Sequence, residues 1–427
     1  MHRRFYLLGF FILFCIALHS LNTQAGVFQP EPGSIVPADS IIASIERGDS
    51  TIIDSCEIFG SLIKKGTWEE PDTIRNSLRI TRTTFHDKVD FLACHFSKGV
   101  WFDSSIFLQK VSFSSSTFNG VAAFSGASFR NLALFASSTF QGDADFTAAT
   151  FNEGVAFVSA TFSGDVSFGS ATIRKSALFW EATFGGNAMF NYSKCEWVNF
   201  VEVRFNGDAF FRKAAFEEAN FAKANFAGVV DFSLKEFKDV YISWQQLKEH
   251  LWFYEPATYK LMKYFEEQRQ LDDADGVYLF LKDHERMEKR WYIRYPEYWL
   301  IQQTCGYGVK PLNTLILSMM IIILFTFFYT KADAIREIEK ERGHRLGRRL
   351  YRDVPKSWGK RFYYALYFSL HTFIIGVVSD WHPTDEFLFN TRKIKLFRFR
   401  TLSMIEGALG WILLVLFVVT LTRKFIR

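Results

Sequence analysis

The chain has 427 residues, of which 49% are hydrophobic and 49 are phenylalanine, and its formal net charge is +5. The positive excess is concentrated in residues 331–361, with 11 Lys and Arg against 5 Asp and Glu, which is typical of a cytoplasmic membrane loop rather than of nucleic-acid binding. Beyond the N-terminal segment, Cys56, Cys94, Cys195 and Cys305 are too scattered for a metal site, and their spacing leaves both buried thiols and a disulfide open.

Residues 1–25 predict a secretory signal peptide. His2, Arg3 and Arg4 precede an apolar run from Phe5 to Leu18, and Ala25 suits a cleavage site. An uncleaved signal anchor is the alternative. Both place the following residues outside, so we expect the next domain to be exported to the periplasm or the cell exterior.

Residues 26–84 are expected to cap a repeat domain. Pro37–Ser40 begins a short amphipathic helix that Gly48 ends, and Ile52–Ile63 resembles a first coil. Repeat arrays need such caps because their end would otherwise expose unpaired strand edges.

Phenylalanine recurs through residues 85–237 at gaps that alternate between six and five, so the repeat unit is eleven residues with two Phe. The first run is Phe85, Phe91, Phe96, Phe102, Phe107, Phe113, Phe118, Phe124, Phe129, Phe135, Phe140, Phe146, Phe151, Phe157, Phe162 and Phe168. After Cys195 the step becomes five, at Phe200, Phe205 and Phe210. A fixed period of this kind predicts a solenoid.

A square β-coil explains this spacing better than a helix does. In a helix, a mean gap of 5.5 residues would turn successive Phe by roughly 190°, to opposite sides. In a coil, Phe points inward and Asn119-Gly120, Gln141-Gly142 and Ser163-Gly164 supply the turns. Two units per coil give some seven coils, or a rod roughly 30–35 Å long at about 4.8 Å per coil.

The units Ala214–Glu218, Ala219–Lys223 and Ala224–Gly228 place a small residue two positions before Phe. In this they resemble the pentapeptide-repeat proteins. The resemblance implies a right-handed quadrilateral β-helix for residues 85–240. Some members of that family mimic DNA, but residues 85–237 carry 15 Asp and Glu against 12 Lys and Arg, a net of −3 that is too small for a nucleic-acid mimic.

Residues 241–311 predict amphipathic helices that link the rod to a membrane, with a protein-docking surface as the alternative. Two apolar segments follow in residues 312–427. Leu312–Thr330 contains no charge and Leu402–Thr422 contains one, Glu406. Each segment is long enough to cross a bilayer, so we expect a multi-pass protein of the cell membrane.

Between these segments, residues 362–383 resemble the pore helix and filter of two-span potassium channels. The resemblance rests on Ala365–Ser369, Thr372, Asp380 and Pro383. Alignment on Asp380 puts the following residues where that family has Thr-Val-Gly-Tyr-Gly: Ile375, Gly376, Val377, Val378 and Ser379. Both filter glycines are lost, which puts potassium selectivity in doubt because glycine allows the backbone to aim its carbonyls at the ion.

The side of the membrane from which the pore-like segment enters leaves several alternatives open. If the repeats are exported, the pore-like segment enters from the cytoplasm, opposite to the family arrangement. The pore is then inverted, the N-terminal half is not exported, or residues 362–379 are a third span instead of a filter. Single residues are equally open: His371 faces a pore or is packed, Glu406 marks a pathway or reaches the interface, and Gly407 and Gly410 hinge a gate or allow close helix packing.

The leading hypothesis is therefore an oligomeric ion channel, tetrameric by resemblance, whose repeat domain senses, assembles or binds a partner. The candidate filter residues are Thr372, Ile374, Ile375, Gly376, Val377, Val378, Ser379 and Asp380. The candidates for a gate, or for a functional polar residue within a membrane span, are Glu406, Gly407 and Gly410. A non-conducting membrane-anchored scaffold is the alternative. We expect a lipid bilayer and a protein on the solenoid as partners, with no nucleic acid, cofactor or bound metal. An enzyme is not expected, since no phosphate loop or nucleophile motif appears.

Overall fold

The computed structural model describes residues 26–67, 69–236, 238–331, 334–339, 350–353, 357–375, 381–390 and 395–426. The predicted signal peptide, residues 1–25, lies outside the described residues. The chain forms two compact units, one up to Tyr278 and one from Leu279 onward.

The first unit is a parallel β-solenoid of about ten turns, which confirms the predicted fold class. Most strands have only two residues, and each pairs in parallel with the strands one coil before and after it. For example, β14 (Thr117–Phe118) pairs with β18 (Thr139–Phe140). One coil therefore consists of two eleven-residue units, as the sequence predicts.

Within the described residues, the strands of the solenoid form three sheets. The first contains β1 (Val27–Phe28), β3 (Ser50–Asp54), β7 (Leu78–Thr81), β11 (Val100–Trp101), β15 (Ala122–Ala123), β19 (Ala144–Asp145), β23 (Val166–Ser167), β26 (Ala188–Met189), β29 (Ala209–Phe210) and β32 (Val230–Asp231). The second contains β6 (Asp72–Ile74), β10 (Cys94–Phe96), β14, β18, β22 (Thr161–Phe162), β25 (Thr183–Phe184), β28 (Arg204–Phe205) and β31 (Asn225–Phe226).

The third sheet covers two faces, which the long strand β24 (Thr172–Leu178) joins. One face contains β2 (Ile35–Pro37), β4 (Glu57–Phe59), β8 (Thr84–Phe85), β12 (Ile106–Phe107), β16 (Ser128–Phe129) and β20 (Thr150–Phe151). The other contains β5 (Leu62–Lys65), β9 (Val89–Leu92), β13 (Val111–Ser112), β17 (Ala133–Leu134) and β21 (Val155–Ala156). Beyond β24 follow β27 (Lys194–Asn199), β30 (Ala215–Asn220) and β33 (Asp239–Tyr241).

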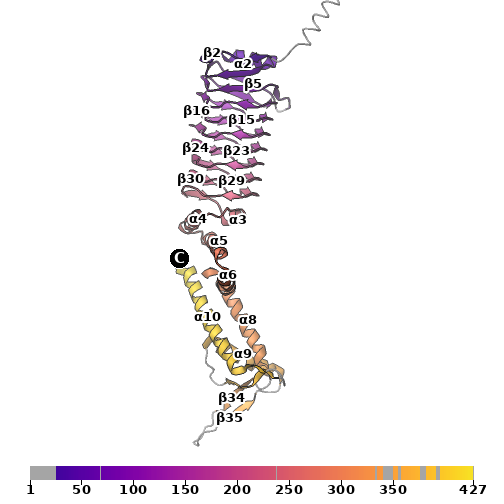
Figure 1. The fold of residues 1–427 in the computed structure, drawn as a ribbon, viewed down its shortest axis with the longest axis vertical. Coiled ribbons are helices and arrows are strands. Elements are labelled where there is room, and N and C mark those ends of the chain that lie inside the picture. Colours follow the sequence, from indigo (N-terminus) through magenta and orange to yellow (C-terminus); the bar gives the residue numbers. More distant parts are fainter. Residues whose placement is uncertain are drawn as a thin grey trace, which may run out of the picture. The chain divides into compact units, whose positions relative to one another are not determined.

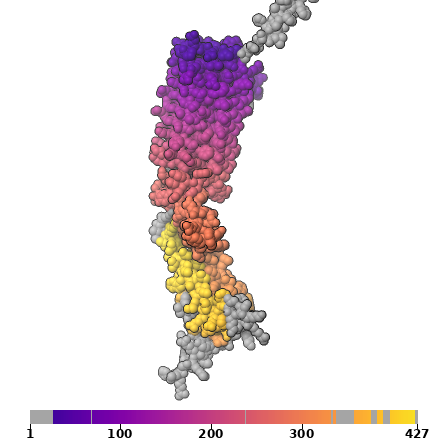
Figure 2. Space-filling model, viewed as in Figure 1, coloured from indigo at the N-terminus to yellow at the C-terminus, as the bar shows by residue number. Residues whose placement is uncertain are grey.

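Stacked phenylalanine rings fill the interior. Phe118 and Phe140 are fully buried, with ring centroids 4.7 Å apart and planes 5° from parallel, and Phe140 repeats the stack with Phe162 at 4.8 Å. Ring columns meet edge to face, as between Phe135 and Phe146. Both geometries are favourable for aromatic pairs. In the space-filling view the coils follow one another in sequence order from indigo to rose (Figure 2).

Each unit contains one left-handed corner. Positive φ recurs at Ser104, Ser115, Gly126, Ser137 and Ala148, one position per unit. The predicted turn glycines have a different purpose: a Cβ on Gly142 would lie 2.7 Å from the Gly120 carbonyl carbon of the preceding coil. Glycine at these positions therefore permits the close approach of successive coils.

The change of step near Cys195 has a structural cause. In β24 the pairing shifts between Ile173 and Ser176, and later coils are one residue shorter, as the partners Phe184 and Phe205 show. The predicted inward residue Phe210 is wrong by one position. Phe211 is fully buried and stacks on Phe190 at 5.4 Å, whereas Phe210 is only half-buried, because a one-residue slip reverses the face of a strand.

Helices lie at both ends of the solenoid. At the start, α2 (Ala38–Arg47) ends at the left-handed Gly48, as the sequence predicted. After the last coil come α3 (Trp244–Leu247), α4 (Glu255–Glu267) and α5 (Leu271–Glu288), the last of which contains the boundary between the units. The Tyr264 hydroxyl donates to the Val240 carbonyl at 2.8 Å and accepts from its N–H at 2.9 Å, so α4 satisfies backbone groups of the final strand.

In its described residues, the second unit contains three long helices and short connecting elements. Two helices among the described residues are long and apolar enough to span a membrane, Pro311–Tyr329 and Phe399–Arg423. Its helical elements are α6 (Trp291–Glu297), η1 (Tyr298–Gln302), α7 (Gln303–Cys305), η2 (Gly306–Gly308), α8 (Pro311–Tyr329), α9 (Trp358–Ile375) and α10 (Phe399–Ile426). Its strands are β34 (Ile335–Glu339), β35 (Leu350–Asp353), β36 (Trp381–Pro383), β37 (Phe387–Asn390) and β38 (Lys395–Arg398).

Candidate membrane site between helices α8, α9 and α10

The three long helices pack around a small aromatic core. The Tyr329 ring at the end of α8 lies edge-on to Phe368 of α9 at 4.7 Å and 6.4 Å from Phe399 of α10. Ala365 and Phe325 belong to the same buried cluster. Each helix thus contacts the other two, and Figure 1 shows α8, α9 and α10 close together.

The chain on both sides of α9 returns to one small sheet. Strand β35 precedes α9 and strand β36 follows it, and both pair antiparallel with β34, which comes directly after α8. Residues 353 and 381 therefore lie at the same end of the helix pair α8 and α10. This arrangement differs from that of a third crossing, which would end on the opposite side.

Helix α9 reaches about halfway along its neighbours. Phe362 packs against Phe327, and the Ser369 hydroxyl lies 3.1 Å from the Ile322 carbonyl, so α9 runs antiparallel to α8. Near its C-terminal end, the Phe373 carbonyl lies beside Gly410, eleven residues into α10. At about 1.5 Å per residue this is a depth of about 17 Å, roughly half the ~30 Å of a bilayer core.

A buried polar cluster sits where the three helices meet. Glu406 of α10 is fully buried and hydrogen-bonds the Ser369 hydroxyl, while Thr372 lies one turn further along α9 and is also buried. The Tyr329 hydroxyl faces the same carboxyl without completing a hydrogen bond. Glu406 Oε2, Thr372 Oγ1 and Tyr329 Oη have no hydrogen-bond partner among the described residues, which is costly for groups removed from water.

Gly410 packs tightly against α9. A Cβ at this position would lie 1.9 Å from the Phe373 carbonyl oxygen, so only glycine permits the observed contact. Gly407 is buried on the same helix. The geometry at Gly410 is that of close helix packing, one of the two interpretations the sequence left open.

The structure places only some of the predicted filter residues. Thr372 is buried at the polar cluster, whereas Ile374 and Ile375 are about half exposed at the end of α9. The remaining candidates lie outside the described residues: Gly376, Val377, Val378, Ser379 and Asp380. His371 Nδ1 donates to the Tyr367 carbonyl at 2.9 Å, and its ring lies 4.1 Å from that of Tyr367.

Tyr329 was missed as a site residue by sequence reasoning. Ser369 and Glu406 lie far from it in the sequence, on two other helices, and no local motif links the three. The available signal was a tyrosine at the end of an apolar segment, which is common at membrane interfaces. Only the packing of α8 on α9 shows that its hydroxyl faces the bundle interior.

The comparisons with known proteins concern the first unit. A family model described as pentapeptide repeats (9 copies) matches residues 80–128, 124–172, 149–194 and 190–233. The repeat segment therefore consists of pentapeptide repeats, which confirms that part of the predicted resemblance. No curated protein and no solved structure matches the chain. The resemblance of residues 312–427 to potassium channels stays a prediction.

Proposed function

We propose that this pentapeptide-repeat chain is one subunit of an oligomeric membrane channel, in which α9 is a re-entrant helix beside an ion path. The observation that carries the proposal is the return of the chain, on both sides of α9, to the sheet at β34. A helix that reaches half the depth of a bilayer and whose flanks meet on one side is the arrangement of a pore helix. The proposal assigns no catalytic role to the chain.

Membrane physics then requires further copies. A chain that turns back at mid-depth leaves backbone groups without partners unless protein covers them or they line a water-filled cavity. In a single chain, α9 exposes an apolar face of Tyr363, Leu370 and Ile374. Packing of neighbouring subunits against this face would cover it and enclose an axis. The tetramer implied by the channel resemblance is the assembly we propose.

The buried polar cluster supports a pathway through this assembly. An acidic residue within a membrane helix is costly and usually serves a path or a partner. The Ser369 hydroxyl has one hydrogen but lies within reach of both Glu406 and the Ile322 carbonyl. A protonated Glu406 could donate to Ser369, which could then donate to Ile322, so both bonds can form together.

Ion flux in liposomes containing the full-length protein tests the proposal. Wild-type protein should release an ion gradient above the rate of empty liposomes, and Ser369→Ala should change that rate by perturbing the support of Glu406. Ser403→Ala is the matched control, because among the described residues the Ser403 hydroxyl bonds only to the Arg400 carbonyl of its own helix. Absence of flux under varied ions, voltage and pH would refute conduction.

The second candidate is a non-conducting scaffold, anchored by α8 and α10, whose solenoid binds a protein partner. The observation that favours it is the tight contact of Gly410 with Phe373, which suits a rigid anchor as well as it suits a gate. The loss of both filter glycines in the sequence points the same way. A scaffold would keep its partner binding when residues 374–380 are scrambled in a stably folded protein.

A further inference from the structure

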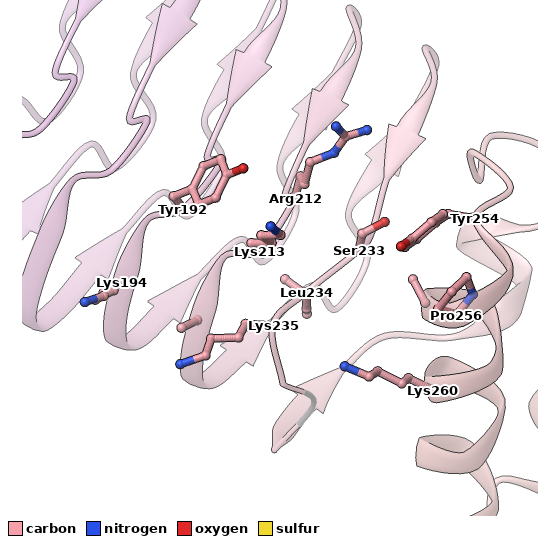
Figure 3. Close-up of a pocket in the computed structure, with 12 residues that line it drawn as sticks. Tyr192, Lys194, Arg212, Lys213, Ser233, Leu234, Lys235, Tyr254, Pro256 and Lys260 are labelled. Atoms are coloured by element: carbon pink, nitrogen blue, oxygen red, sulfur yellow. The ribbon is translucent and has the colours of Figure 1, made fainter.

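A groove lies between the last coils of the solenoid and the start of α4, entirely within the first unit. Its volume is about 810 Å³. The floor is apolar and contains the buried Leu234. Figure 3 shows Lys213 and Lys235 on the coil side and Lys260 on the α4 side.

The groove has a strong positive charge. Of its five cationic side chains, only Arg212 has a carboxylate partner, Asp231, at 3.1 Å. The other four have no ion pair among the residues that the structure describes: Lys194, Lys213, Lys235 and Lys260. None of the described residues that line the groove is acidic. Four uncompensated cations around one cavity favour an anionic ligand.

Two aromatic rings stand at the sides of the groove. Tyr192 is 51% exposed and Tyr254 is 53% exposed, although both are large apolar rings. Lys213 Nζ lies over the Tyr192 ring, 5.5 Å from its centroid, within cation–π range. The ligand should therefore present flat, partly apolar faces as well as negative charge.

The site is local to the end of the rod. Tyr192 and Lys213 occupy left-handed corners whose equivalents in the three preceding coils are Gly126, Ala148 and Ser170. Large side chains occur at this corner at Arg82, in an early coil, and then at Tyr192 and Lys213, where α4 forms the opposite wall of the groove.

We propose that this groove binds a linear acidic polysaccharide, with its carboxylates at the lysines and its pyranose rings on the two tyrosines. Lys194 and Lys235 hold equivalent positions two coils apart, as the ladder bonds of their N–H groups to Ala171 and Ala214 show. This separation is about 10 Å, twice the coil spacing of about 4.8 Å. A pyranose unit is about as long as one coil, so a uronate polymer repeats its charges in step with the coils.

Other polyanions fit less well. Duplex DNA carries its phosphate charges densely along an extended axis and would need a longer basic surface, whereas the cations here surround one groove. An acidic peptide would satisfy the lysines but has no flat apolar face for Tyr192 and Tyr254. The inference does not depend on ion conduction.

Calorimetry of the full-length protein in detergent micelles tests the proposal. Hexagalacturonate should bind, with an affinity that falls as salt rises, and maltohexaose, which is neutral, should not. The double variant Lys235→Glu with Lys260→Glu should lose tenfold or more in affinity, because charge-assisted contacts are replaced by repulsion. Lys110→Glu is the matched control, since Lys110 is exposed and unpaired in the described structure but lies outside the groove. Tyr192→Ala should weaken binding at high salt as well.

Two results would overturn the assignment. One is hexagalacturonate binding that is absent or equal in wild type and double variant, provided that hydrogen exchange shows both proteins folded. The other is equal or tighter binding of hexathymidylate or hexaglutamate, which would show a general polyanion site and not a polysaccharide site. Liposome flux separates this outcome from failure of the channel proposal, because neither lysine lies in the second unit.

Discussion

Replacement of Phe135 by alanine tests whether the ring lattice holds the solenoid together. Phe135 is fully buried; its ring stacks on Phe113 at 5.3 Å and Phe157 at 4.9 Å, and meets Phe124 and Phe146 edge-on, both at 5.5 Å. Phe→Ala in a core costs about 3–5 kcal/mol, and each aromatic pair adds roughly 0.5–1.5 kcal/mol beyond burial. We therefore expect Phe135→Ala to lower stability by about 5 kcal/mol.

Phe216 provides the matched control. It is 5% exposed, and its one ring contact in the described structure is Phe211 at 6.4 Å, because its column neighbours in the preceding coils are Cys195 and Ile173. Phe216→Ala should cost about 3 kcal/mol, the burial and cavity contribution with little loss of ring pairing.

Native-state hydrogen exchange measures the loss of stability in both variants, and it does so in the coils that contain the substitution. Solenoid stability is largely a sum over neighbouring coils, so Phe135→Ala should accelerate exchange of the amides that join its coil to the next, such as Phe135 N–H to Ala156 and Ser137 N–H to Val158. A cost of about 5 kcal/mol corresponds to an opening constant that is several thousandfold larger. Equal costs for the two variants, or less than about 2 kcal/mol for Phe135→Ala, would refute the ring-lattice explanation.

Two further changes should have measurable effects on stability. Gly410→Ala places a Cβ 1.9 Å from the Phe373 carbonyl oxygen, so it should destabilise the helix packing by about 1–3 kcal/mol and lower the melting temperature in detergent, whereas Gly359→Ala, with nothing within 4 Å, should not. Burial raises the pKa of the Cys195 thiol from 9.0 to about 12. Above pH 9 the unfolded thiol loses its proton while the folded one keeps it, so stability should fall between pH 9 and about 12. Urea unfolding should show a weaker fall for Cys195→Ala, and an equal fall would contradict the assignment.

The repeat architecture could be predicted because the same spacing of Phe recurs many times along the sequence. Two Phe per eleven residues define the coil length, and the pairing of Thr117 with Thr139 reproduces it. The local error at Phe210 arose because two adjacent Phe satisfy the same spacing, and only the pairing shift in β24 selects Phe211. The purpose of Gly142 was also hidden, because it depends on contact with Gly120 one coil away.

The polar cluster could be predicted only in part. Glu406 was evident as the one charge in an apolar segment, and Thr372 as part of a channel-like motif. The bond between Ser369 and Glu406, and the burial of Thr372 and Tyr329 near it, depend on three helices that meet at one depth. The basic groove was missed for the same reason, since Lys194 and Lys260 are distant in the sequence and meet only because α4 covers the final coils.

Because the chain returns to the β34 sheet on both sides of α9, the structure predicts a membrane topology. This topology distinguishes a re-entrant α9 from a third membrane span. The Arg423 guanidinium donates to the Tyr307 carbonyl at 2.8 Å, so the end of α10 lies beside the start of α8, and the two helices are antiparallel. With α8 and α10 as the two crossings, reporters fused after residues 240 and 427 should lie on the same side and a reporter after residue 345 on the other. If residues 362–379 cross as a third span, the reporter after 427 joins the one after 345 instead. That second pattern would remove the re-entrant helix, and with it the structural support for a pore.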